Sequence, residues 1–139
     1  MSDARESLLI LGIGVDLVSV KRIRSASERT GGRLLVRLFT PAERDCCRAR
    51  RAAYECYAAR FAAKEAVFKA LGTGFSGCCW HDVEITNGPG GGPVVALTGS
   101  AARVAARRGI TGVLLSLSHE GDQAVAFAIA VGPSESQRK

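Results

Sequence analysis

The chain has 139 residues, of which 47% are hydrophobic, and it carries a net charge of +6. This length fits a single domain with its own core, and this hydrophobic content excludes a disordered chain. The charge is regional, because residues 21–51 hold ten bases and three acids, a local charge of +7. We expect an acidic partner there, and charge alone allows nucleic acid, anionic lipid or an acidic protein.

The cysteines predict neither a disulfide framework nor a metal site. They form two adjacent pairs and one single residue: Cys46-Cys47, Cys78-Cys79 and Cys56. The odd count and the absence of a C-x-x-C spacing favour a reducing cytoplasm. Zinc binding by the second pair with His81 is disfavoured, because adjacent cysteines point apart and no second ligand pair has suitable spacing. We interpret the cysteines as incidental, with Cys46 and Cys47 exposed.

Residues 8–16 predict a buried strand, because branched apolar residues dominate it and Asp16 ends it. This run is too short to span a bilayer and lacks the features of a signal peptide, so we expect a cytoplasmic protein without a membrane partner. Ser19 is suited to cap a helix through residues 21–26, which should end near Gly31-Gly32.

The middle of the chain predicts helices. Three leucines within residues 34–38 indicate a short one. Thr40-Pro41-Ala42-Glu43 is typical of a helix start, with Thr at the N-cap, Pro at the first position and Glu completing a capping box. The helical region should continue to Leu71 with a break near Arg51, and Gly72 is placed for a left-handed C-cap.

The second half predicts mostly strands. Residues 80–86 and 93–97 form a hairpin around a glycine-rich turn, a helix follows over residues 99–108, and two more strands cover residues 112–119 and 124–131. Helices followed by hairpin-linked strands indicate an α+β domain with an antiparallel or mixed sheet. We assign this domain to residues 8–131, between an N-terminal extension (1–7) and a polar C-terminal tail (132–139).

Phe61, Glu65 and Lys69 are spaced by four residues and therefore share one helical stripe. Neighbouring aromatic residues require burial, which places Glu65 and Lys69 at the margin of a core. A carboxylate beside an ammonium group suits a metal–phosphate site, since one holds the cation and the other neutralises phosphate oxygens. The alternative is a solvated i,i+4 salt bridge contributing about 0.3–0.5 kcal/mol.

Other polar signals are ambiguous when taken singly. Gly12-x-Gly14-x-Asp16 lacks the third glycine of a dinucleotide-binding fold, and Asp16 could simply cap a helix. His119 closes a strand without a nucleophile elbow near it, so a hydrolase triad is unsupported. The glycines around Thr73 could end a helix or let backbone amides approach a phosphate.

Taken together, five blocks of the chain resemble the holo-acyl-carrier-protein synthases, the short type of 4′-phosphopantetheinyl transferase. The blocks are GIGVDLVSVKRI at 12–23, FTPAE at 39–43, ARFAAKEAVFKALGTG at 59–74, WHDVEI at 80–85 and LSLSHE at 115–120. The resemblance covers about residues 8–131. The glycine-rich turn before Pro93 departs from the usual family pattern, so we carry over no contacts there.

The resemblance implies transfer of 4′-phosphopantetheine from coenzyme A to a serine of an apo acyl-carrier protein, in fatty-acid or polyketide synthesis, with release of adenosine 3′,5′-bisphosphate. It implies a trimer of α+β subunits with active sites between neighbours. Asp16 and Glu65 would hold Mg²⁺, and Lys69 would stabilise the leaving phosphate. Either Glu65 or a metal-bound water would take the serine proton. The residues implied to lie along coenzyme A are Arg60, Lys69, Gly72, Thr73, Gly74 and His119. Those implied to meet the acidic carrier are Lys21, Arg22 and Arg24.

Two other classes are weighed against this one. A non-enzymatic nucleic-acid-binding domain would explain the basic region, but only Phe39 lies among its ten bases, where stacking surfaces are expected. A different Mg²⁺-dependent phosphotransferase or hydrolase would explain the acidic and basic site residues but not the basic first helix. We therefore expect no nucleic-acid partner.

Overall fold

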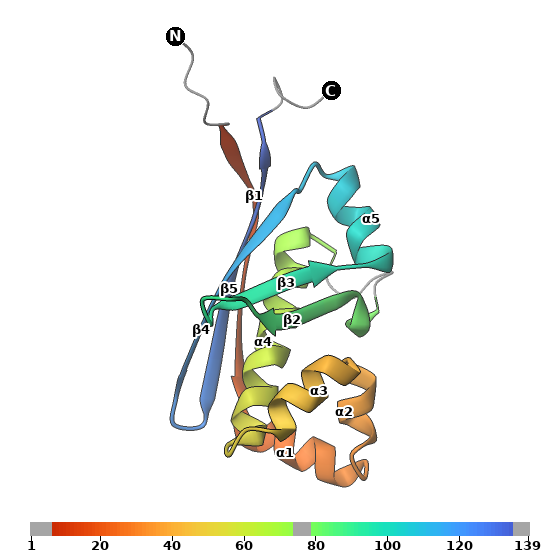
Figure 1. The fold of residues 1–139 in the computed structure, drawn as a ribbon, viewed down its shortest axis with the longest axis vertical. Helices are drawn as coiled ribbons and strands as arrows, with labels where there is room; N and C mark the ends of the chain where they lie inside the picture. The colour runs from red at the N-terminus through yellow and green to blue at the C-terminus, as the bar shows by residue number, and fades with distance from the viewer. Residues whose placement is uncertain (1–6, 74–78, 135–139) are drawn as a thin grey trace.

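The computed structural model describes residues 7–73 and 79–134. Its main element is a three-stranded antiparallel sheet in which β5 lies between β1 and β4 (Figure 1). The three strands are β1 (Leu8–Ser19), β4 (Gly112–Glu120) and β5 (Gln123–Pro133). A separate antiparallel hairpin consists of β2 (Val83–Asn87) and β3 (Pro93–Leu97). The predicted α+β class is confirmed.

The helices occupy the predicted segments. They are α1 (Val20–Arg29), α2 (Arg33–Leu38), α3 (Pro41–Arg48), α4 (Ala53–Leu71) and α5 (Gly99–Arg107). The prediction of a strand from Trp80 is wrong at its start, because residues Trp80–Asp82 form a 3-10 turn. The Asp82 carboxylate accepts hydrogen bonds from the Cys79 and Ser100 amides and so holds this turn. Across the described residues, no helix has the length and apolar composition needed to cross a membrane.

Local hydrogen bonds explain where the helices begin and end. The Ser19 hydroxyl accepts from the Arg22 amide and caps α1. Thr40 and Glu43 form the predicted capping box at the start of α3, with the Glu43 carboxylate 2.8 Å from the Thr40 amide. Gly72 ends α4 with φ +81°, a left-handed conformation that glycine adopts without steric cost.

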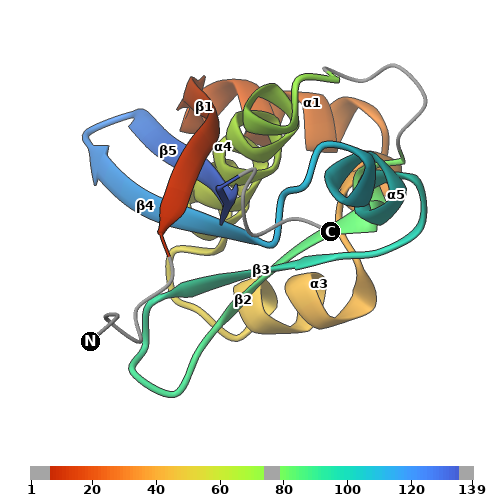
Figure 2. The same ribbon diagram turned by 90° about the horizontal axis from the view of Figure 1, so that it is seen from above.

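Helix α4 lies against one face of the sheet, and strands β1, β5 and β4 curve around it (Figure 2). Two glycines of β1 make this contact close. A Cβ atom at Gly12 would lie 1.9 Å from the Ala70 carbonyl oxygen, and one at Gly14 would lie 2.0 Å from that of Ala66. These glycines therefore serve helix–strand packing. The facing residues are small as well, namely Ala62, Ala63, Ala66, Ala70, Ala124, Ala126, Ala128 and Ala130.

The opposite face of the sheet is apolar and uncovered in the single chain, so the prediction of a fully buried first strand is wrong. Ile13 and Leu17 of β1 are 62% and 63% exposed, Leu114 of β4 is 61% exposed and Phe127 of β5 is 45% exposed. Because side chains alternate along a strand, only one side of β1 reaches α4. An apolar surface of this kind indicates an interaction site.

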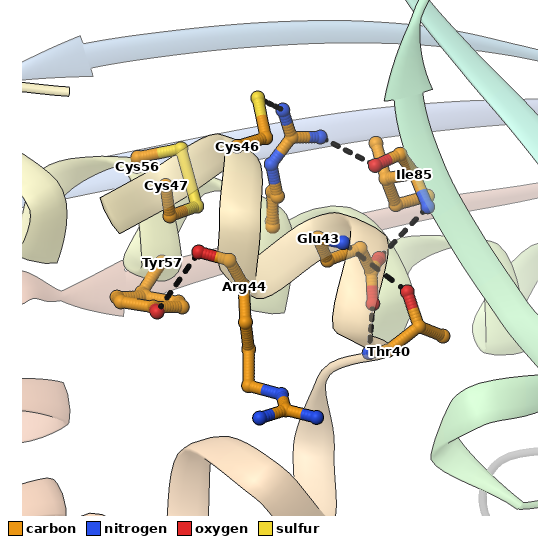
Figure 3. Close-up of a disulfide and its surroundings, with 9 residues drawn as sticks. Thr40, Glu43, Arg44, Cys46, Cys47, Cys56, Tyr57 and Ile85 are labelled. Atoms are coloured by element: carbon orange, nitrogen blue, oxygen red, sulfur yellow. Dashed lines mark hydrogen bonds between the residues drawn. A yellow bond between two sulfur atoms is a disulfide. The ribbon is translucent and has the colours of Figure 1, made fainter. Parts of the chain in front are cut away.

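A buried ion pair joins α3, α4 and β2. The Glu43 carboxylate and the Lys64 ammonium group are both fully buried and lie 2.8 Å apart. Glu43 also accepts from the Ile85 amide at 2.8 Å, and Figure 3 shows its side chain between Thr40 and Ile85. Lys64 donates to the backbone carbonyls of Trp80 and Val83. Burial lowers the pKa of Lys64, and the adjacent Glu43 opposes this shift. The sequence pattern did not single out this pair.

Cys47 of α3 and Cys56 of α4 form a disulfide, with their Cα atoms 5.4 Å apart (Figure 3). Cys47 is fully buried and Cys46 is half-buried, so the interpretation of these two residues as exposed is wrong. The interpretation of the cysteines as incidental is also wrong for Cys47 and Cys56, because they are linked. The two helices run side by side after the turn that separates them, and this tertiary contact brings the two thiols together. The spacing of nine residues does not reveal it.

Candidate active site

Asp16 lies within β1, where it pairs with Ala126 of β5. It does not cap α1, because Ser19 occupies that position. The Asp16 side chain is 16% exposed, and its carboxylate lies 3.3 Å from the Lys69 ammonium group of α4. Lys69 also donates to the Val15 carbonyl at 2.9 Å, while half of its side chain stays in solvent. The contact between β1 and α4 thus brings together residues that are 53 positions apart.

Glu65 lies one turn before Lys69 on α4 and is half-buried. Burial raises the pKa of Glu65, the nearby Asp16 carboxylate raises it further, and Lys69 opposes the shift. Asp16 and Glu65 therefore act on each other electrostatically, and the structure brings together all three residues of the predicted metal–phosphate site. Two carboxylates that repel each other are stabilised by a cation between them.

Asp16 and Glu65 border a pocket of about 780 Å³. It lies between β1, α1, α2 and α4, and it is both basic and apolar. Its other residues include Lys21, Arg22, Arg29, Arg37, Phe61 and Trp80. Phe61 and Trp80 stack with their ring centroids 5.1 Å apart. The sequence pattern did not place Trp80, Arg29 or Arg37 here, because they come from three separate elements.

The three basic residues predicted to meet an acidic partner do not all lie at the same location. Lys21 and Arg22 border the same pocket as Glu65. The Arg24 guanidinium group instead lies 5.0 Å from the centre of the Tyr54 ring, which is a cation–π contact. The start of α1 is fixed by Asp122 in the turn between β4 and β5, whose carboxylate accepts from the Ser19 hydroxyl at 2.5 Å and the Lys21 amide at 2.9 Å.

Arg60 and His119 lie away from Asp16 and Glu65, at a second pocket of about 490 Å³. This pocket is bordered by Arg50, Arg51, Ala52, Glu55, Cys56, Ala59, Arg60, Asn87, Leu117, Ser118 and His119. Arg60 is almost fully buried, and its guanidinium group donates to the Ile85 carbonyl at 2.5 Å and to the Cys46 sulfur at 3.1 Å. Within one chain, the residues predicted to line one ligand therefore do not lie at one site.

The glycine turn after α4 forms a third location. Gly72 lies close to the Arg108 guanidinium group, which donates to the Leu71 carbonyl and to the Leu11 carbonyl. These bonds satisfy a carbonyl at the end of α4. Thr73 is half-buried beside this turn, and Gly74 lies outside the described residues.

The two carboxylates suit Mg²⁺ better than a metal bound by protein side chains alone. Among the described residues, no group of three or more His, Cys, Asp or Glu side chains could hold a metal ion. Mg²⁺ keeps several waters and usually takes one or two carboxylates together with substrate phosphates. The pair Asp16 and Glu65 fits that donor set, and Lys69 adds a positive charge for phosphate oxygens.

Sequence comparisons match this chain to known enzymes. Residues 12–128 match the model of the 4′-phosphopantetheinyl transferase superfamily. A holo-[acyl-carrier-protein] synthase of Desulforudis audaxviator is 99% identical over 131 residues, which cover 94% of this chain and all of that protein. One from Trichlorobacter lovleyi is 45% identical over 126 residues, covering 90% of this chain and all of the relative.

Solved structures agree with these matches. Holo-[acyl-carrier-protein] synthase from Neisseria meningitidis aligns with a TM-score of 0.82 and 35% identity, covering 88% of this chain and 98% of that one. The Helicobacter pylori enzyme in complex with coenzyme A aligns with a TM-score of 0.73 and 28% identity, covering 85% and 98%. The chain therefore belongs to the holo-[acyl-carrier-protein] synthase family of the 4′-phosphopantetheinyl transferase superfamily.

Proposed function

We propose that this holo-[acyl-carrier-protein] synthase uses Asp16, Glu65 and Lys69 to transfer 4′-phosphopantetheine from coenzyme A to a serine of an apo acyl-carrier protein. The observation that carries this assignment is the meeting of two carboxylates and an ammonium group from β1 and α4, the two carboxylates bordering the larger pocket. The reaction breaks a pyrophosphate bond and releases adenosine 3′,5′-bisphosphate. Positioning and charge neutralisation are the main contributions that a protein makes to such a step.

Asp16 and Glu65 would hold Mg²⁺. When bound, the ion would neutralise negative charge on the pyrophosphate and on the departing phosphate. The raised pKa of Glu65 also brings this carboxylate closer to the range in which a side chain can accept a proton near neutral pH. Glu65 is therefore a candidate to take the proton of the carrier serine.

Lys69 would stabilise charge that develops as the pyrophosphate splits. Its ammonium group is held by Asp16 and the Val15 carbonyl while half of its side chain remains exposed, so it is both oriented and accessible. A positive charge placed in advance beside a leaving phosphate acts mainly in the transition state.

We expect Lys69→Ala to lower kcat by about 10²–10³, with a smaller effect on coenzyme A binding. Steady-state kinetics with varied coenzyme A measures both quantities. Arg103→Ala, which removes an exposed cation of α5 outside both pockets, is the comparison variant and should leave kcat unchanged. An increase of the KM for coenzyme A alone would make Lys69 a binding residue and contradict the catalytic role.

The basic start of α1 would dock the acidic carrier protein. Lys21 and Arg22 border the pocket that contains Glu65, so a carrier bound there would present its serine near the proposed metal site. Forked contacts between arginine and carboxylate groups give both attraction and orientation. The Arg24 guanidinium group packs on the Tyr54 ring, so Arg24 would contribute long-range electrostatic attraction and no direct contact with the carrier.

Arg22→Glu should raise the KM for the carrier at least about tenfold, on the scale of 1.4 kcal/mol per decade, and leave the KM for coenzyme A nearly unchanged. The transfer rate of the unmodified enzyme should also fall as the salt concentration rises, and the transfer rate of the variant should fall less. Arg103→Glu on α5 carries the same charge change on an exposed side chain outside both pockets. Equal losses for coenzyme A and carrier would show that α1 is not the docking surface.

A homotrimer would cover the apolar face of the sheet and could unite the two pockets. Ile13, Leu17, Leu114 and Phe127 leave a hydrophobic surface that a second copy can bury. If active sites lie between neighbours, Arg60 and His119 of one subunit would adjoin Asp16 and Glu65 of the next. The nucleotide end of coenzyme A would then lie in the smaller pocket.

Light scattering at micromolar concentration should give the mass of three chains. Leu17→Lys should reduce this mass, because it places a charge on the apolar face. Val94→Lys, an equally apolar residue 46% exposed on the separate hairpin, should not. A monomer mass for the active enzyme would contradict the trimer.

The activity itself is tested by incubating the protein with coenzyme A, Mg²⁺ and an apo acyl-carrier protein, and then weighing the carrier. A mass gain of one phosphopantetheine arm supports the proposal. Hydrolysis of coenzyme A without carrier modification would favour another Mg²⁺-dependent phosphotransferase or hydrolase. We propose a cytoplasmic enzyme that acts without nucleic acid or membrane, since its substrates are coenzyme A and a carrier protein.

A further inference from the structure

The disulfide between Cys47 and Cys56 encloses the turn that carries Arg50 and Arg51 to the smaller pocket. Residues 48–52 are exposed and are held by local hydrogen bonds, among them those from the Ala49 amide to the Asp45 carbonyl and from the Cys56 amide to the Ala52 carbonyl, each at 3.2 Å. The turn is closed by the hydrogen bond from the Arg50 amide to the Cys47 carbonyl at 3.0 Å. Ala52, the N-cap of α4, has no side-chain acceptor and therefore caps no amide of this helix. The disulfide adds a covalent constraint to these hydrogen bonds and to the hydrogen bond between the Arg50 and Cys46 side chains.

The two sulfur atoms differ in their access to solvent. Cys47 is fully buried, whereas Cys56 is half-buried and borders the smaller pocket. A thiol in that pocket can therefore reach the Cys56 sulfur and displace Cys47. Attack at the accessible sulfur is the geometry that thiol–disulfide exchange requires.

Cys46, next to Cys47 in the chain, connects the same helix end to Arg60. Its sulfur lies 3.1 Å from the Arg60 guanidinium group, which also borders the smaller pocket. Burial raises the pKa of the Cys46 thiol, but Arg60 and Arg50 outweigh this effect and lower it below its ordinary value. A movement of the C-terminal end of α3 would therefore displace the three arginines that border the smaller pocket.

We propose that the Cys47–Cys56 disulfide is a redox-responsive site that controls phosphate binding in the smaller pocket, and that a dithiol reductant opens it. In the oxidised state, the link holds Arg50 and Arg51 beside Arg60. The exposed guanidinium groups of Arg50 and Arg51 are suited to a phosphorylated nucleotide, whereas the buried Arg60 donates to the Ile85 carbonyl and the Cys46 sulfur. Reduction frees the turn and disperses this charge. The proposal rests on the proposed function only for the identity of the ligand, the nucleotide end of coenzyme A.

The chemistry balances as ordinary exchange. A thiolate of the dithiol attacks the Cys56 sulfur, the S–S bond breaks, and its electron pair leaves with the Cys47 sulfur, which takes a proton. The second thiol of the reductant then attacks the mixed disulfide. This step releases Cys56 as a thiol and leaves the reductant as its own disulfide. The protein gains two electrons and two protons, and the reductant loses them.

The experiment compares air-oxidised enzyme with enzyme treated with dithiothreitol. Peptide mapping should find Cys47 linked to Cys56 only in the oxidised sample. Reduction should accelerate amide hydrogen exchange in residues 48–55 at least fivefold, lower Tm by about 5–10 °C and weaken the binding of adenosine 3′,5′-bisphosphate about fivefold or more. Cys47→Ser/Cys56→Ser should behave as reduced enzyme under both conditions. Cys79→Ser, at an exposed cysteine outside the disulfide, should behave as the unmodified chain.

The proposal is overturned if the oxidised enzyme contains no such link, or if reduction changes neither the exchange of residues 48–55 nor the affinity for the bisphosphate. Reduction of the unmodified chain gives this answer even if the double serine variant does not fold. An exchange and affinity difference in an enzyme that transfers nothing to any carrier would contradict the proposed function while supporting the redox site.

Discussion

Glu65→Gln and Asp16→Asn should each lower the rate of phosphopantetheine transfer by at least about 10²–10³ while leaving the fold intact. Both substitutions keep the shape of the side chain and remove the charge that would hold Mg²⁺. The two carboxylates act on each other from β1 and α4, so neither is expected to substitute for the other. Transfer rates at limiting and saturating Mg²⁺, with circular dichroism for folding, measure the effect.

Asp45→Asn on α3 is the control for this pair, because Asp45 is an exposed carboxylate outside both pockets. It should retain the activity of the unmodified enzyme. Activity of Glu65→Gln or Asp16→Asn within about twofold of the unmodified enzyme at limiting Mg²⁺ would refute the metal assignment.

The same Glu65 variant has a second expected effect, on stability without metal. Burial and Asp16 raise the pKa of Glu65 in the folded protein, so ionisation of this carboxyl group destabilises the fold as pH rises above its ordinary value of 4.5. Glu65→Gln should therefore raise Tm at neutral pH in the absence of Mg²⁺, and the gain should vanish as pH falls below that value. Added Mg²⁺ should raise Tm of the unmodified enzyme alone. An equal Mg²⁺ effect on both proteins would place the ion elsewhere.

Lys64→Met should lower the free energy of unfolding by about 3–5 kcal/mol, the largest expected effect on stability. The substitution leaves the Glu43 carboxylate buried without the ammonium group that lies 2.8 Å from it. The hydrogen bonds from the Thr40 and Ile85 amides would remain, but they do not neutralise the charge. Urea denaturation at one fixed protein concentration measures the change, because the proposed trimer would make stability depend on concentration.

Glu43→Gln/Lys64→Met is the matching double variant. It should recover part of the loss, because the uncompensated charge is gone while the Glu43 shape is kept. The exposed pair Asp45 and Arg48, with side chains 70% and 65% accessible, is the control, and Asp45→Asn should cost less than about 1 kcal/mol. A loss of similar size at both pairs would show that burial does not set the contribution of the Glu43–Lys64 pair.

The sequence by itself determined the local structure, because helix ends depend on neighbouring residues. Ser19, the Thr40–Glu43 capping box and Gly72 mark three helix boundaries, and the structure confirms each one. The alternation of side chains likewise predicted the hairpin of β2 and β3. The five sequence blocks also indicated the enzyme family, which the comparisons confirm.

Long-range contacts were decided only by the tertiary structure. The spacing of residues on α4 predicted that Glu65 and Lys69 share one face, but the packing of α4 on β1 brings Asp16 to them. That packing depends on Gly12 and Gly14, whose role in close approach could not be distinguished from a turn or a ligand loop. The sequence also marked Arg60 and His119, and the fold places them in a separate pocket.

The buried Glu43–Lys64 pair and the Cys47–Cys56 disulfide show the same limit. Each joins α3 to α4, and whether such residues meet depends on how the two helices pack after the turn at residues 49–52. Hydrophobic patterning reports which face of an element is apolar, but it does not report what covers that face. For this reason β1 was predicted to be buried, whereas the tertiary structure covers one side with α4 and leaves Ile13 and Leu17 exposed.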